Sequence, residues 1–139
     1  MNLLQIVELA EKIATEAHQG QFRRGGVIPY IERPKTVVSR LGEDHDAQIV
    51  AWLHDVLEDC DVSEKDLIER GIPEKHLHAV RLLTKTKGVS YEDYLEGVAR
   101  SKLASTVKIA DMISNLADHP TPRQIRKYAK GLERLTRDF

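Results

Sequence analysis

Cysteine is nearly absent from this sequence, and its scarcity bounds the kind of protein that the chain can form. Cys60 is the one cysteine among 139 residues, so no internal disulfide is available. We therefore expect a protein of the reducing cytoplasm rather than a secreted domain held together by disulfides. At this length a single domain, residues 1–139, can bury enough apolar surface to fold without cross-links.

Long apolar runs and an excess of one charge are missing too. No stretch reaches the roughly 18 apolar residues that a membrane-spanning helix needs. The N-terminal segment is interrupted by Glu8, Glu11 and Lys12, so it lacks the apolar run of a signal peptide. The formal net charge is −1, which gives no reason to expect a membrane or a nucleic acid as partner. The oligomeric state is left open.

Apolar residues recur at spacings of three and four along most of the chain, as is typical of amphipathic helices. No segment shows the sustained alternation of a strand. The sequence therefore predicts an all-α domain of about seven or eight helices. We expect these helices over residues 3–18, 34–42, 45–59, 64–70, 74–83, 90–101, 102–118 and from 122 onward.

Residues 51–59, "AWLHDVLED", bring one histidine and three carboxylates into a short stretch. On a continuous helix these polar side chains lie within roughly 140° of the helix circumference, and large apolar residues take the other side. The four are His54, Asp55, Glu58 and Asp59. A solvated helix face explains the spacing equally well. However, like charges one turn apart are mildly destabilising, and a bound divalent cation would reverse that repulsion.

A second polar stripe lies in "VKIADMISNLAD", residues 107–118. Lys108, Asp111 and Asn115 share one side of the expected helix, opposite apolar residues that include Ile113. For this stripe alone a solvated face is the commoner explanation. If the two polar edges adjoin, then His54, Asp55 and Asp111 converge on one cation. An imidazole with two carboxylates suits Mn²⁺, Mg²⁺ or Fe²⁺ rather than a structural zinc site.

Three motifs together resemble a known family. They are "AHQGQFRRGGVIPYIERP", "AWLHDVLED" and "VKIADMISNLAD", and in order and spacing they are similar to the HD phosphohydrolase superfamily. Within it they most resemble the hydrolase domains of RelA/SpoT-type alarmone enzymes and their small stand-alone relatives. The resemblance covers about residues 3–120. It implies an HD-type helical bundle that removes the 3′-pyrophosphate of (p)ppGpp, a small-molecule nucleotide, with Mn²⁺.

The resemblance also implies a role for each matching residue of the reaction centre. His54 and Asp55 match the family's metal-binding pair, and Asp111 matches its later metal-binding aspartate. Glu58 and Asp59 match the acidic pair that positions or activates the attacking water. The implied cofactor is therefore a divalent metal, with Mn²⁺ as the first choice.

Further matches imply contacts to the substrate. Arg23 or Arg24 matches an arginine near the nucleotide, and the length of this loop leaves the choice between them open. Tyr30 matches the aromatic residue of the "PYI" element, and Asn115 matches an asparagine of the substrate pocket. We expect Lys108 to help offset the negative charge of the phosphate.

Arg33 departs from the family pattern. The family has a metal-binding histidine at this position, and an arginine stays protonated and cannot bind a metal. The site could have lost its metal, leaving a nucleotide-binding regulator. Alternatively, Arg33 could turn outward to a substrate phosphate, or replace an ancestral histidine, and Glu32 or His18 could supply a ligand instead. We expect a hydrolase, because all the other residues of the site are retained.

The remaining histidines and the cysteine have less specific explanations. We expect His18 to cap the first helix, and His45, His76 and His78 to lie at the surface. Cys60 has no evident base partner in the sequence, so we assign it no role as a nucleophile. A basic stretch at the C-terminal end leaves nucleic-acid binding as a weak alternative, because it offers few aromatic residues for stacking.

Overall fold

The computed structural model describes residues 1–23 and 25–139 and shows an all-α fold, as predicted. Arg24, one of the two candidate nucleotide-contacting arginines, lies outside the described residues. Nine helices form over the described ranges. They are α1 (Leu3–Ala17), α2 (Glu32–Ser39), α3 (His45–Leu53), α4 (Val56–Asp59), α5 (Glu64–Arg70), α6 (Glu74–Leu83), α7 (Tyr91–Ala99), α8 (Lys102–Leu116) and α9 (Pro122–Thr136).

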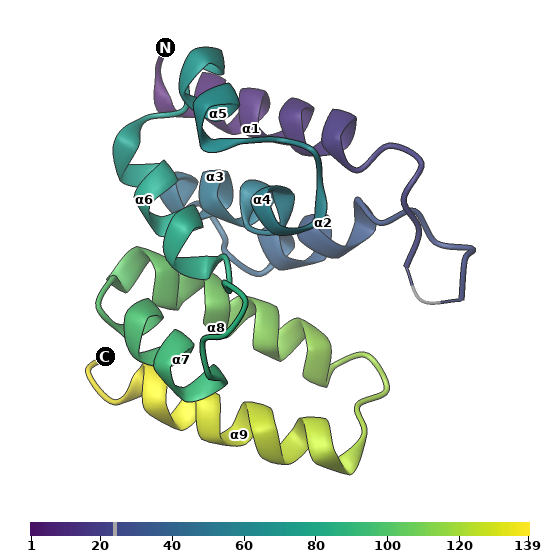
Figure 1. Ribbon diagram of the computed structural model, residues 1–139, viewed down its shortest axis with the longest axis vertical. Helices are drawn as coiled ribbons and strands as arrows, with labels where there is room; N and C mark the ends of the chain where they lie inside the picture. Colours follow the sequence, from purple (N-terminus) through teal and green to yellow (C-terminus); the bar gives the residue numbers. More distant parts are fainter. Residues whose placement is uncertain (24) are drawn as a thin grey trace.

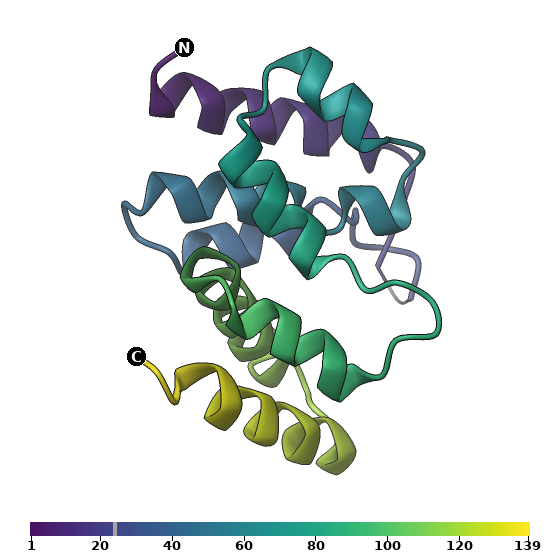
Figure 2. The same ribbon diagram turned by 60° about the vertical axis from the view of Figure 1, so that its left-hand side comes forward.

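Helix α3 is the centre of the bundle. It packs against α1, α2, α6 and α8, so it joins the N-terminal half of the chain to the C-terminal half. Helices α1 and α5 lie at one end of the molecule, and α7, α8 and α9 lie together at the other (Figure 1). The rotated view shows the same order, with the N-terminus beside α1 and the C-terminus beside α9 (Figure 2).

The sequence of α3 explains its central place. From Ile49 to Leu53 every side chain is buried, and a helix that is apolar on all sides is stable only when other helices surround it. Asp44 begins the helix, because its side chain accepts a hydrogen bond from the backbone N–H of Ala47. Among the described residues, no helix combines the length and the apolar character that crossing a membrane requires.

The helix expected over residues 45–59 is divided in two, and this division accounts for a helix beyond the number expected. His54 and Asp55 form a turn between α3 and α4. The His54 imidazole donates from Nδ1 to the carbonyl oxygen of Ala51 at 2.6 Å, so the side chain takes part of the hydrogen bonding that a continuing helix would use. The prediction of one continuous helix was therefore wrong at the point where the site begins.

Most helix starts are set by local capping, which the sequence made visible. Ser63 and Thr121 each form a capping box with the residue three positions later. Helix α2 is an exception, because it begins at Glu32, two residues before Pro34. Arg33 consequently lies in the first turn of α2 rather than in the preceding loop.

His76 is buried, contrary to the expectation of a surface position. Only 1% of the residue is exposed, and its Nε2 donates to Asp46 Oδ1 at 2.7 Å, joining α6 to α3. The ammonium group of Lys75 lies 3.2 Å from the same oxygen. The hydrogen bond from His76 lowers the pKa of Asp46, against the opposing effect of partial burial. Asp46 therefore stabilises the fold in its charged form.

We predict that Asp46→Ala lowers the free energy of unfolding by about 1–3 kcal/mol, because it leaves a buried N–H without an acceptor. The ordinary pKa of the carboxyl is 3.8 and the folded-state value is lower. The effect should thus be full above about pH 4 and fade as pH falls through the folded-state pKa. Urea denaturation at several pH values measures it. The exposed Glu43→Ala is the control, and equal stability of the two variants near pH 7 would contradict the prediction.

Candidate active site

The turn between α3 and α4 fixes the orientation of His54. A carbonyl oxygen can only accept a hydrogen bond, so the contact with Ala51 places the proton of the neutral ring on Nδ1. The other ring nitrogen, Nε2, is buried and has no hydrogen-bond partner among the described residues. Only 4% of His54 is exposed. In the neutral ring, the lone pair of Nε2 therefore points in one fixed direction, at the C-terminal end of the buried helix α3.

Two carboxylates meet this nitrogen. Oδ2 of Asp55 lies 3.3 Å from His54 Nε2, and Oδ1 of Asp111 lies 3.8 Å from it. Asp55 begins α4, whereas Asp111 comes from the middle of α8, which packs against α3. The three residues expected to bind a metal are thus brought together, and their role as ligands stays a prediction.

Asp111 lies on the buried face of α8, with 3% of its surface exposed. The solvated face, which was the commoner explanation for this stripe, is wrong for Asp111. Ile113, expected on the apolar side, is instead 41% exposed. Helix α8 packs against α3, and its buried face includes Asp111 and Met112 but not Ile113, so the apolar pattern of α8 follows a different register from the one expected.

Two cations hold the carboxylates. Arg33 places Nη2 at 3.2 Å from Asp111 Oδ1 and Nε at 3.5 Å from Asp55 Oδ2, and Lys108 Nζ lies 3.2 Å from Asp111 Oδ2. Burial alone would raise the pKa of Asp111, but the positive charges of a protonated His54, of Lys108 and of Arg33 lower it. Burial alone would likewise lower the pKa of Lys108, and Asp111 raises it above its ordinary value. Asp111, Lys108 and Arg33 are therefore all charged around neutral pH.

Tyr30 joins Asp55 to Asp59. Its hydroxyl lies 2.9 Å from Asp55 Oδ2 and 3.1 Å from Asp59 Oδ2, and it is placed to donate its one proton to either carboxylate. Burial, followed by the charge of Asp55, raises the pKa of the Tyr30 hydroxyl, so the group stays protonated. Burial and the charges of Asp59 and Asp55 raise the pKa of Glu58. Glu58 is thus the carboxyl of this cluster best suited to take up and release a proton.

These side chains line a cavity of about 400 Å³. The same cavity has a cationic wall, which consists of Lys85, Lys108 and Lys127 together with Tyr91 and Tyr94. The ammonium group of Lys127 lies over the ring of Tyr91, 4.3 Å from its centre. Sequence reasoning missed every member of this wall except Lys108, because these residues come from three different segments with no shared motif.

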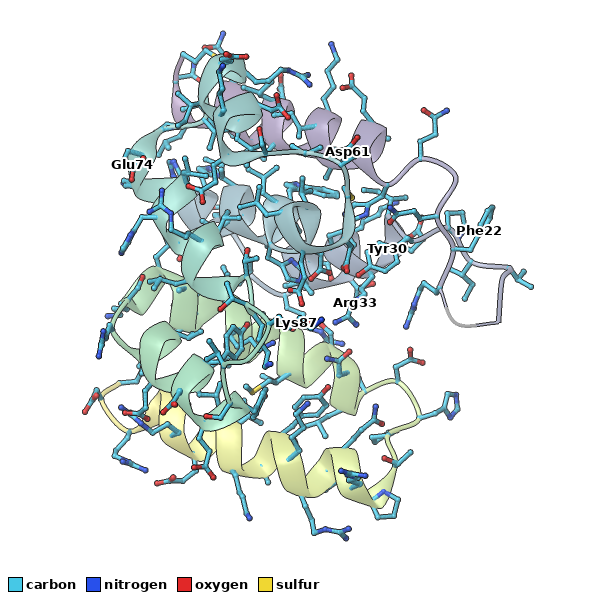
Figure 3. The ribbon with its side chains drawn as sticks, in the orientation of Figure 1. Phe22, Tyr30, Arg33, Asp61, Glu74 and Lys87 are labelled. Atoms are coloured by element: carbon cyan, nitrogen blue, oxygen red, sulfur yellow. The ribbon has the colours of Figure 1, made fainter. Side chains whose placement is uncertain are left out.

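A second cavity of about 650 Å³ adjoins the first, and Tyr30 and Arg33 line both. Tyr30 and Arg33 lie next to each other between the N-terminal helices and α8 (Figure 3). Asn115 and Tyr128 line the second cavity, and Arg33 Nη1 donates to Asn115 Oδ1 at 2.7 Å. Arg23 lines it too and pairs with Asp118. The expected substrate residues that the structure describes thus border the two cavities.

His18 and Glu32 do not replace the missing ligand in this structure. Glu32 is directed to Lys35, with 3.9 Å between their charged groups. His18 is buried, and its Nδ1 lies 2.9 Å from Gln21 Oε1 and 3.2 Å from Cys60 Sγ. A histidine beside Cys60 was not foreseen. However, burial raises the pKa of the Cys60 thiol, which disfavours the reactive thiolate.

The donor set fits a divalent cation. Nε2 of His54 is an orphaned buried nitrogen that faces carboxylate oxygens instead of donors, and one nitrogen with two oxygens suits Mn²⁺ or Fe²⁺. The distances between these side chains are those of an ion-pair cluster. In the part of the chain that the structure describes, no three His, Cys, Asp or Glu side chains lie close enough together to hold a metal ion. The difference between this ion-pair cluster and a metal site lies in Arg33, whose guanidinium contacts both carboxylates.

Comparisons with known proteins bear out the family resemblance. No family model matches the chain. It is 37% identical over 112 residues to a guanosine-3′,5′-bis(diphosphate) 3′-pyrophosphohydrolase of Haemophilus influenzae, covering 76% of this chain and 16% of that protein. It is 31% identical over 144 residues to a probable GTP pyrophosphokinase of Mycobacterium leprae, covering 94% of this chain and 18% of that protein. The chain thus spans less than a fifth of these curated relatives.

A solved structure extends the similarity to the fold. It is described as a metazoan ortholog of SpoT that hydrolyses ppGpp, and it superimposes with a TM-score of 0.78 at 26% sequence identity. The match covers 94% of this chain and 85% of the other. The arrangement of helices is therefore that of an HD-type hydrolase over almost the whole length of the chain.

We predict that Asp111→Asn lowers the free energy of unfolding by about 3–5 kcal/mol, because it removes the buried carboxylate that Lys108 and Arg33 share. Asp118→Asn is the matched control. The Asp118 side chain is 52% exposed and pairs with Arg23, so its loss should cost less than about 1 kcal/mol. Denaturant unfolding without added metal compares the two, and equal losses would contradict a stabilising role for the buried cluster.

Proposed function

We propose that this chain, an HD-type domain related to the RelA/SpoT hydrolases, removes the 3′-pyrophosphate of (p)ppGpp or a closely related nucleotide. The observation that carries the proposal is the meeting of His54 Nε2 with Asp55 and Asp111 beside an acidic pair and a wall of lysines. The relatives support this substrate class, because one of them is a 3′-pyrophosphohydrolase of the same nucleotide.

A divalent cation is the proposed cofactor, with Mn²⁺ as the first candidate, and His54, Asp55 and Asp111 would hold it. When bound, it would lower the pKa of a water molecule and polarise a phosphate oxygen. Glu58 would accept a proton from the attacking water and return it to the leaving oxygen. Its raised pKa suits this exchange better than that of an ordinary exposed carboxyl.

Asp59 and Tyr30 would position the acidic groups. The Tyr30 hydroxyl lies within hydrogen-bond distance of both Asp55 and Asp59, so it limits the rotation of the two carboxylates relative to each other. A water molecule bound between them would meet an arrangement fixed before the substrate arrives. Such preorganisation lowers the barrier because the groups need not reorient during the reaction.

The cationic wall would receive the pyrophosphate. Lys108 stays charged despite its burial, and Lys85 and Lys127 line the same cavity. Phosphate groups carry their negative charge throughout the reaction and gain more charge on the leaving oxygen. Ammonium groups held in a partly buried cavity offset this charge more effectively than they would in water.

The second cavity would receive the nucleoside. Asn115 offers an amide for polar contacts, and Tyr128 offers an aromatic ring beside it. The Asn115 side-chain nitrogen lies 3.4 Å from the Tyr128 hydroxyl. Arg23 stands at the rim, paired with Asp118. A small-molecule nucleotide in the cytoplasm is thus the proposed partner, and the absence of nucleic-acid and membrane partners stays a prediction.

The alternative function is a nucleotide-binding regulator that has lost catalysis through Arg33. Neither the relatives nor the described residues favour it specifically, because the other residues of the reaction centre are retained together. The two functions differ in one observable, which is the release of product. A regulator binds the nucleotide and leaves it intact with or without Mn²⁺.

We predict that the chain releases pyrophosphate from ppGpp in the presence of Mn²⁺ and that Asp55→Ala lowers this rate at least about a hundredfold. Release would be measured over a panel of ppGpp and common nucleotides, with and without Mn²⁺. Asp61→Ala is the control, because Asp61 is an exposed acidic residue close in sequence (Figure 3). Circular dichroism checks that both variants remain helical. Binding without release across the whole panel would contradict the hydrolase.

A further inference from the structure

We propose that Arg33 is an internal competitor for the divalent metal: its guanidinium occupies the carboxylate oxygens that a metal ion would bind and must leave before the ion can enter. The inference rests on the proposed metal site of His54, Asp55 and Asp111. It concerns a residue by which this chain differs from the pattern of its family. Three contacts of Arg33, the charge of the cluster and the adjoining cavity support it.

The contacts of Arg33 fall on the oxygens that face His54. Oδ2 of Asp55 lies 3.3 Å from His54 Nε2 and 3.5 Å from Arg33 Nε. Oδ1 of Asp111 lies 3.8 Å from His54 Nε2 and 3.2 Å from Arg33 Nη2. A metal ion bound by His54 would use these same two oxygens. The guanidinium and the ion therefore compete for the same two carboxylate oxygens.

The fixed positive charge of Arg33 means that the guanidinium and a metal ion cannot occupy these carboxylates together. Arginine keeps its positive charge at any pH that a protein tolerates, so it cannot make room for a metal by losing a proton, as a histidine does. Burial alone would lower the pKa of Arg33, but Asp111 and Asp55 raise it. Two cations at one pair of carboxylates would repel each other strongly in this partly buried place. Only movement of the side chain can resolve the conflict.

The second cavity offers Arg33 a place to go. Arg33 lines both cavities, and its Nη1 already donates to Asn115 on the side of the second cavity, at 2.7 Å. Arg33 lies in the first turn of α2, so rotation about its side-chain bonds alone can carry the guanidinium away from Asp55 and Asp111. No movement of a helix is needed. In the second cavity the guanidinium would face the proposed nucleotide and could pair with its phosphates.

Two consequences follow for the protein itself. The binding of a metal ion must displace a guanidinium, so the affinity of the chain for Mn²⁺ should be weaker than its donor set alone would give. In return, Arg33 stabilises Asp55 and Asp111 when no metal is supplied. Removing the guanidinium should strengthen metal binding and at the same time make the fold depend on the metal.

The test is a titration of the full chain with Mn²⁺, in which electron paramagnetic resonance measures the free ion. We expect Arg33→Gln and Arg33→His to bind Mn²⁺ about tenfold or more tightly than the wild type, because neither retains the fixed charge. Thermal unfolding gives a second readout. Chelator should lower the midpoint of Arg33→Gln, and Mn²⁺ should restore it, by a larger amount than in the wild type.

Two further variants make the outcomes distinct. Arg40→Gln removes an arginine of the same region that contacts Ser114 of α8 at 2.8 Å, and it should bind Mn²⁺ like the wild type. Asp55→Asn combined with Arg33→Gln should abolish the tight binding, which locates the ion. Equal affinity of Arg33→Gln, Arg33→His and the wild type would overturn the inference and leave the metal site intact. No binding by any variant would overturn both the metal site and the inference. If Arg33→Gln does not fold, Arg33→Met carries the same comparison, because it also removes the charge without adding the imidazole ligand that Arg33→His supplies.

Discussion

The buried carboxylate of Asp111 is the group on which the site depends. Only 3% of its surface is exposed, and the positive charges of a protonated His54, of Lys108 and of Arg33 lower its pKa against the effect of burial. A buried charge without partners is costly, so the helices that carry these partners must pack in one arrangement. Helices α2, α3 and α8 thereby meet at a single point. The packing of the bundle and the chemistry of the cavity thus rest on the same cluster.

The same cluster lies where two cavities with different linings adjoin. The cavity of about 400 Å³ is lined by both acidic groups and lysines, which suits a phosphate group attacked by water. The neighbouring cavity of about 650 Å³ offers an amide and an aromatic ring, which suits a nucleoside. Tyr30 and Arg33 stand between the two. Arg33 is therefore placed where it can contact both the proposed metal site and the proposed nucleotide.

The sequence alone predicted the helices well because capping and periodicity are local. Ser63 and Thr121 begin their helices as expected. The division at His54 was not predictable from spacing, since it depends on a hydrogen bond between the imidazole and the carbonyl of Ala51. The motifs named the acidic residues of the site. The lysines of the cationic wall could not be found in this way, because tertiary packing alone brings Lys85 and Lys127 to the cavity.

Anomalous diffraction at the manganese edge, from crystals grown with Mn²⁺, would locate the proposed metal ion. We predict an anomalous peak adjoining His54 Nε2 and the facing oxygens of Asp55 and Asp111, with the Arg33 guanidinium turned into the second cavity. A manganese ion bound only elsewhere, with Arg33 still between the two carboxylates, would contradict the proposed metal site. Such a result would mean that the convergence of these residues serves the stability of the fold and not the binding of a metal.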